Sequence, residues 1–186
     1  MLKDNVVAIT GGAGLIGTAF SKAIIKNRGK VIIGDVSATK GVSIQNELGI
    51  DNALFVEVDT SDTNSIDSFL KIGKGHFGKI DSAIHCAYPR SEQWGTEFEG
   101  LKAEGLKEDL FNQLGGAILF SQRLISFYRD QGYGNLIHVS SIQGVAAPKF
   151  EHYKSTKMVS PIAVSYTHLR AHETVLDLVC RLLLEK

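Results

Sequence analysis

The sequence predicts an α/β fold of the doubly wound type, in which helices cover both faces of a parallel sheet. Three observations lead to this class. Short apolar runs of strand length alternate with amphipathic stretches of helix length. The first run ends in a glycine-rich turn, and the second ends in an acidic residue, Asp35. Strands that alternate with helices form βαβ units, whose crossovers are right-handed and whose strands are parallel.

Each element has its own sequence pattern. Buried strands are predicted where a mostly apolar run stands between turn signals, at residues 6–10, 30–35, 53–58, 80–86 and 135–140. Helices are predicted where apolar residues recur at helical spacing, at residues 15–26, 39–48, 61–72 and 110–128. Ser61 or Asp62 can cap the third helix. A polar, glycine-containing loop is expected over residues 87–100.

Composition bounds the functional class. The chain has 186 residues, 44% of them hydrophobic and 22% charged, which fits one globular domain. Lys and Arg total 20, as do Asp and Glu, so we expect neither nucleic acid nor a membrane as partner. Two cysteines, no signal peptide and no apolar run of membrane-spanning length favour a cytoplasmic location. These properties are ordinary for a soluble globular protein, and a small-molecule substrate is expected from the motifs described next.

The turn after the first predicted strand has the spacing G-x-x-G-x-x-G, formed by Gly11, Gly14 and Gly17. Small residues let the backbone approach a pyrophosphate, and the helix N-terminus at Leu15 and Ile16 offers free N–H groups. A glycine triplet alone would also suit a plain tight turn, but its place between a strand and a helix favours dinucleotide binding. The predicted architecture is therefore Rossmann-type, with three α/β/α layers.

Asp35 ends the second predicted strand, 18 residues after Gly17. An acidic residue at this place can accept hydrogen bonds from ribose hydroxyls and repels a 2′-phosphate, so it favours NAD over NADP as the cofactor. The alternative is that Asp35 only starts a turn, since Val36 and Ser37 follow.

Together with the glycine turn and Asp35, four further features occur in an order that resembles the short-chain dehydrogenase/reductase family over residues 1–163: Asp59-Thr60, Ala87, Asn112 and Ser140-Ser141. The resemblance implies that Asp59 and Thr60 lie near the adenine and that Ala87 borders the cofactor. It also implies that Asn112 orders a proton-relay water and that Ser141 holds the substrate carbonyl or hydroxyl. Members are commonly dimers or tetramers. The complete protein to which this chain belongs, called the full-length parent below, is therefore expected to be a homo-oligomer.

The segment after the fourth predicted strand reads H-C-A-Y-P-R over residues 85–90, where the family usually has N-N-A-G. It is similar to the N-N-A-Y-P-R version of a branch linked to flagellin and surface-glycan modification. The glycine spacing also resembles extended members that act on nucleotide sugars. His85 and His138 fall at strand positions without a cluster of ligand spacing, so the sequence predicts no metal.

The resemblance thus implies an NAD-dependent oxidoreductase that interconverts a hydroxyl and a carbonyl, with a sugar or glycan precursor as the substrate class. Two alternatives stay open. One is a nucleotide-sugar epimerase or dehydratase of the extended type. The other is a catalytically inactive NAD-binding Rossmann protein, because a fold alone does not fix function.

The family's catalytic pair is a tyrosine and a lysine four residues later, on one helix face. The lysine charge favours the tyrosinate form, so the tyrosine works as general acid or base. Tyr153 and Lys157 match this spacing, and Tyr153 follows Ser141 by 12 residues. Pro161, however, would break a helix continuing from Lys157 and suits a helix start after Ser160. The alternative is a pair further along the parent chain.

The last part of the chain, residues 164–186, resembles a translated sequencing adapter over most of its length. Residues 164–174 and 178–186 match two successive adapter pieces in one reading frame. We therefore expect a non-native tail at 164–186 and an incomplete Rossmann domain at 1–163, truncated before its last strands. The predicted activity is that of the full-length parent.

The adapter hypothesis makes a direct prediction about the source DNA. Resequencing the locus across codon 163 should show a native reading frame that departs from the present chain at codon 164. Native sequence that runs unbroken into codons 164–186 would contradict the hypothesis, and residues 164–186 would then belong to the domain.

Overall fold

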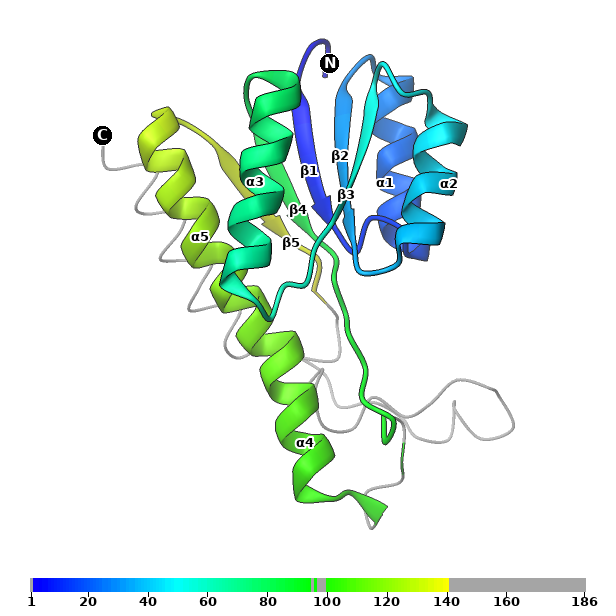
Figure 1. Cartoon of the computed structure of the whole chain (residues 1–186), viewed down its shortest axis with the longest axis vertical. Coiled ribbons are helices and arrows are strands. Elements are labelled where there is room, and N and C mark those ends of the chain that lie inside the picture. The colour runs from blue at the N-terminus through cyan, green and yellow to red at the C-terminus, as the bar shows by residue number, and fades with distance from the viewer. Residues whose placement is uncertain (1, 95, 97–99, 141–186) are drawn as a thin grey trace. The chain divides into compact units, whose positions relative to one another are not determined.

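The computed structural model describes residues 2–94, 96 and 100–140, and these contain a five-stranded parallel sheet (Figure 1). The strand order is β3-β2-β1-β4-β5, and each neighbouring pair is parallel. The strands are β1 Val6–Thr10, β2 Lys30–Asp35, β3 Ala53–Glu57, β4 Ser82–His85 and β5 Asn135–His138. The doubly wound, Rossmann-type class predicted from the sequence is confirmed.

The helices alternate with the strands along the chain. They are α1 Leu15–Lys26, α2 Ala38–Leu48, α3 Thr63–Phe77, α4 Ala103–Leu110 and α5 Gly116–Gln131, with a π-helical turn, η2 Phe111–Gly115, between the last two. The chain forms two compact units, one of Met1–Ala87 with Leu119–Val139 and another that includes Tyr88–Ile118. In the first unit, α1 and α2 lie on one face of the sheet and α3 and α5 on the other (Figure 1). Right-handed crossovers produce this division, since the strand order reverses direction after β3.

The strands are buried on both faces, as expected for a parallel sheet between two helical layers. In β2, Val31 and Ile33 belong to the core on the side of α1. Ile32 and Gly34 face α3, because a Cβ atom on Gly34 would lie 2.7 Å from the Phe69 ring. Glycine in β2 thereby leaves room for Phe69, whose side chain is fully buried.

The predicted element types hold, but several boundaries differ. Of the two cap candidates, Asp62 is the N-cap residue of α3, and Gly78 at φ +82° ends the helix after Phe77 rather than at residue 72. The long helical stretch begins at Ala103 instead of residue 110. That first part is strongly polar, so its helical period was hidden in the sequence, although it is rich in good helix formers. Strands β3, β4 and β5 are shorter than predicted, because their end residues leave the hydrogen-bonded ladder.

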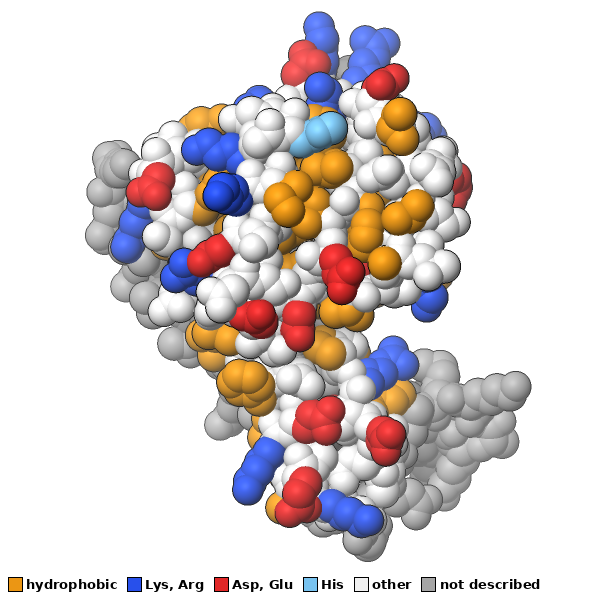
Figure 2. Space-filling model, in the orientation of Figure 1, with side chains coloured by type: hydrophobic (Ala, Val, Ile, Leu, Met, Phe, Trp, Pro, Cys, Tyr) orange, Lys and Arg blue, Asp and Glu red, His pale blue; other side chains and the backbone are white. Residues whose placement is uncertain are grey.

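On the face drawn in Figure 2, Lys and Arg side chains stand among Asp and Glu side chains, as the balanced composition suggests. No helix in the described part of the chain combines the length and apolarity needed to cross a bilayer.

The start of α3 offers a test of the local structure. The Asp62 carboxylate accepts a hydrogen bond of 2.9 Å from the amide of Asn64. Replacing Asp62 by Ala should lower the free energy of unfolding by about 1 kcal/mol in urea titrations, because a helix donor loses its partner. The matched variant Asp62→Asn keeps an acceptor oxygen and should retain most of the stability. Equal losses in both variants would show that the cap does not stabilise the helix.

Candidate cofactor-binding site

The turn between β1 and α1 brings two backbone segments into close contact. Gly11 has φ +66°, and a Cβ atom there would lie 2.7 Å from the amide nitrogen of Ala87, just after β4. A Cβ atom on Gly17 would lie 2.3 Å from the carbonyl oxygen of Gly11. Only glycine fits at either position without a shift of the backbone. The turn therefore presents bare backbone at the carboxyl ends of β1 and β4.

Helix α1 begins at this turn with unsatisfied amides. Gly14 is the N-cap residue, and no side chain caps the helix. Within the described residues, the amides of Leu15 and Ile16 make no hydrogen bond. Their side chains are 91% and 51% exposed. Free N–H groups at the positive end of a helix dipole suit a phosphate group, and the exposed apolar side chains leave room for a ligand above the turn.

Asp35 connects the end of β2 to this turn. One carboxylate oxygen accepts a hydrogen bond of 3.0 Å from the amide of Ala13, and the other accepts one of 3.0 Å from the amide of Ser37. Asp35 thus starts a turn at Ser37, which was the alternative interpretation of the sequence. It also holds the glycine turn through Ala13. Since each oxygen has a further lone pair, the carboxylate can still accept from ribose hydroxyls.

Asp59 and Thr60 follow β3, the strand next to β2, which ends at Asp35. The amide of Val58 donates to the carbonyl oxygen of Asp35 at 3.2 Å, which places the β3 end next to the β2 end. Thr60 is buried, whereas Asp59 is exposed and accepts from both the amide and the hydroxyl of Ser61. The predicted adenine neighbours therefore lie at the same edge of the sheet as Asp35.

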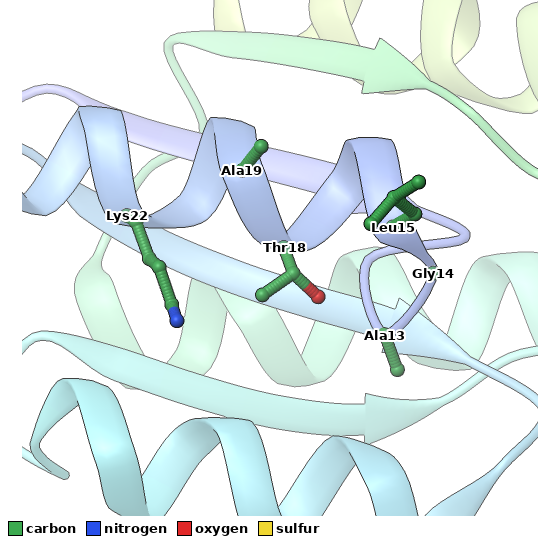
Figure 3. A pocket seen from close by; sticks show the side chains of 6 residues that line it. All are labelled: Ala13, Gly14, Leu15, Thr18, Ala19 and Lys22. Carbon is green, nitrogen blue, oxygen red and sulfur yellow. The ribbon is translucent and has the colours of Figure 1, made fainter.

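A hollow of about 460 Å³ runs from the turn along α1 (Figure 3). At its far end the Lys22 ammonium forms an ion pair of 2.6 Å with Glu47 of α2. The Lys22 ammonium is thus paired with a carboxylate, whereas the amides at the α1 N-terminus have no capping side chain and suit a phosphate. The residues that line the hollow are Ala13, Gly14, Leu15, Thr18, Ala19 and Lys22.

Two histidines lie beside each other at the carboxyl ends of β4 and β5. His85 pairs in the strand ladder with His138, with ring centroids 5.4 Å apart. The Nδ1 atom of His85 lies 2.7 Å from the Thr10 hydroxyl, and Nε2 of His138 lies 3.0 Å from the Ser121 hydroxyl. Among the described residues no group of three potential metal ligands occurs. The sequence pattern indicated the histidines but not their hydroxyl partners, which come from β1 and α5.

Cys86 follows the histidine on β4. Burial raises the pKa of its thiol to about 11, so the group stays protonated at neutral pH. A protonated thiol is a poor nucleophile, and Cys86 therefore does not suit covalent catalysis.

The proposed catalytic residues are described only in part. Asn112 lies half-buried in the π-helical turn η2, a type of helix distortion that often marks functional sites. The sequence did not indicate this distortion. Ser141, Tyr153 and Lys157 lie outside the described residues.

Comparison with known proteins shows the family to which the chain belongs. Residues 5–173 match the family of short chain dehydrogenases. The chain belongs to this family.

Individual relatives agree with this assignment. The chain is 33% identical over 169 residues to the post-translational flagellin modification protein A of Campylobacter coli, covering 89% of this chain and 66% of the relative. It is 27% identical over 147 residues to a 7alpha-hydroxysteroid dehydrogenase of Bacteroides fragilis, covering 78% and 57% of the two chains. The chain thus spans about two thirds of the length of its flagellin-modifying relative.

Solved structures share the fold at lower identity. A short chain dehydrogenase from Bacillus anthracis superposes with a TM-score of 0.80 at 22% identity, with 96% of this chain and 68% of that chain covered. Levodione reductase gives a TM-score of 0.74 at 21% identity, with 96% and 64% covered.

Replacing glycine by alanine should have opposite effects on the free energy of unfolding at two positions, one in the glycine turn and one in helix α3. Gly17→Ala should lower the free energy of unfolding by about 1–3 kcal/mol, because its Cβ would meet backbone atoms of the turn. Gly75→Ala should raise it by about 0.5–1 kcal/mol, since Gly75 lies exposed in α3 with open space around its Cβ position. Urea unfolding of both variants measures these changes. A stable Gly17→Ala variant would show that the turn is not tightly packed.

Proposed function

We propose that the full-length parent is an NAD-dependent oxidoreductase that interconverts a hydroxyl and a carbonyl group on a sugar or glycan precursor. The observation that carries the proposal is the cradle formed by the glycine turn and Asp35. Bare backbone at Gly11, free amides at the start of α1 and a carboxylate at the end of β2 meet at one edge of the sheet. In doubly wound sheets this edge, where the strand order reverses, binds dinucleotides.

Asp35 supports the choice of NAD. The hydrogen bond from the Ala13 amide holds its carboxylate against the phosphate-binding turn. A ribose with free hydroxyls can donate to this carboxylate, whereas a 2′-phosphate would place a second negative charge beside it. No lysine or arginine forms an ion pair with Asp35 among the described residues, so its charge is not neutralised by a side chain.

The chemistry would be shared between cofactor and side chains. The bound dinucleotide supplies the acceptor or donor of a hydride at the substrate carbon. In the oxidation direction, Tyr153 in its ionised form would take the proton of the substrate hydroxyl while Lys157 stabilises the tyrosinate. Ser141 would hold the reacting oxygen, and Asn112 would order the water that relays the proton. If the parent chain has a later Tyr-x-x-x-Lys pair, that pair replaces Tyr153 and Lys157 in these roles.

The substrate class rests on the segment after β4 and on one relative. Residues 85–90 have the sequence H-C-A-Y-P-R, similar to the version found in the glycan-modification branch. The relative from Campylobacter coli takes part in post-translational flagellin modification by its name. Both observations favour a sugar derivative as substrate over a steroid, which the name of the Bacteroides fragilis relative would suggest.

Cofactor preference tests the proposal directly. In calorimetric titrations the chain should bind NADH at least about tenfold more tightly than NADPH, because the Asp35 carboxylate repels the extra phosphate. Asp35→Asn removes the charge and keeps one oxygen acceptor, so one of the hydrogen bonds from Ala13 and Ser37 is lost. The variant should narrow the difference in affinity between NADH and NADPH, and it should weaken the binding of both without abolishing it.

Two results would contradict the proposal. Failure to bind either dinucleotide would remove the basis for an oxidoreductase. Tighter binding of NADPH than of NADH would show that Asp35 stabilises the turn but does not select the cofactor. Asp51→Asn, a surface change outside the site, serves as the matched control and should leave both affinities unchanged.

A further inference from the structure

The segment that follows β4 contains an arginine packed against two aromatic rings. The guanidinium carbon of Arg90 lies 4.1 Å from the centroid of the Trp94 ring and 5.8 Å from that of Tyr88. The two rings meet edge to face at 6.3 Å, and the Trp94 indole N–H donates to the Tyr88 hydroxyl at 3.4 Å. Each member of this aromatic–arginine cluster thus contacts the other two.

The backbone on both sides of Arg90 is fixed by buried side chains. The carbonyl oxygen of Pro89 accepts a hydrogen bond of 2.8 Å from the Gln113 amide group. The amide of Ser91 donates to the Asp109 carboxylate at 2.7 Å. Gln113 is fully buried and Asp109 is 5% exposed. Arg90 is therefore held in place by its rings and by its neighbours, which reduces the entropy lost when it binds a ligand.

Arg90 is exposed, and it forms no ion pair with any described residue. An arginine can stack by the face of its guanidinium group while the N–H groups at its edge donate to another partner. Those edge donors match the two oxygens of a carboxylate or phosphate. The cluster therefore has the chemistry of an acid-binding group without an acid of its own.

The cluster follows the proposed cofactor site closely along the chain. Arg90 is three residues beyond Ala87 in the sequence. Gln113, which holds Pro89, is the neighbour of Asn112 in η2. The segment also leaves the carboxyl end of a strand, where ligands of doubly wound sheets bind.

We propose that Arg90, positioned by Tyr88 and Trp94, is a specificity-determining residue that binds the acid group of an anionic sugar substrate. The acid group is a sugar carboxylate or a sugar phosphate. This inference rests on the proposed function for the sugar part of the substrate, whereas the acid recognition follows from the cluster itself.

Trp94 is the single tryptophan of the chain, so its fluorescence can be used to measure ligand binding at the cluster. Trp94 fluorescence should change on titration with millimolar glucuronate or glucose 1-phosphate in the presence of NADH, and it should not change with glucose, which has no acid group. A response to only one acid tells a carboxylate site from a phosphate site. Equal responses to all three sugars, or no response to either acid, would overturn the inference.

Variants separate the arginine from its surroundings. Arg90→Met should weaken the binding of the acidic sugar by about tenfold or more, because charge-assisted hydrogen bonds are lost. Arg90→Lys should recover part of the affinity, since it keeps a charge but not the planar fork. Arg129→Met, at an exposed arginine of α5, is the matched control and should bind as the unchanged protein does. An unaffected Arg90→Met variant with an unchanged melting curve would overturn the inference.

The two proposals fail in different ways. Calorimetry with NADH, run on the same samples, tests the cofactor site independently of Trp94. NADH binding without a response to acidic sugars leaves the oxidoreductase proposal in place and removes the role of Arg90. A response to acidic sugars without NADH binding removes the oxidoreductase proposal and leaves an acid-binding cluster.

Discussion

The close contact between Gly11 and the backbone at Ala87 is the constraint on which the candidate site depends. Gly11 has a positive φ, and its missing Cβ lets the β1 turn lie directly against the chain that leaves β4. Gly17 then packs on Gly11, so α1 starts at this point with its amides open. A side chain at Gly11 would push the turn away from the chain that leaves β4, and one at Gly17 would push α1 away from the turn.

Several independent interactions converge on the same edge of the sheet. The strand order places β1 between β2 and β4, so the β2 carboxylate and the β4 exit both lie beside the glycine turn. Asp35 then fastens the turn through Ala13, and the β3 end joins through Val58. Below the edge, His85 and Thr10 link β4 to β1 by a buried hydrogen bond. Rigid support of this kind keeps backbone donors in position before a ligand arrives.

In the second unit, buried side chains hold the loop after β4 in place. The loop after β4 would be an ordinary polar connection without its two bonds to buried residues of α4 and η2. Because Gln113 and Asp109 hold it at both sides of Arg90, two aromatic rings can fix the guanidinium group at the surface. The π-helical turn that provides Gln113 also contains Asn112, so one local distortion links the loop to the residue expected to order water.

The sequence alone predicted the α/β class, the order of strands and helices, the glycine turn and Asp35, because these depend on local periodicity and on glycine's freedom at tight turns. The first three elements have the predicted bounds, since strong turn signals flank them. The start of α4 was not predicted because its polar sequence shows no clear apolar period, and the π-helical turn was not predicted because no sequence signal marked it. Partners that are far apart in the chain, such as Thr10 with His85, Asp67 with Arg123 and Pro89 with Gln113, were likewise decided by tertiary structure. A side chain's type and spacing show what it can bind, but only the folded sheet and helices bring a particular partner within hydrogen-bonding distance.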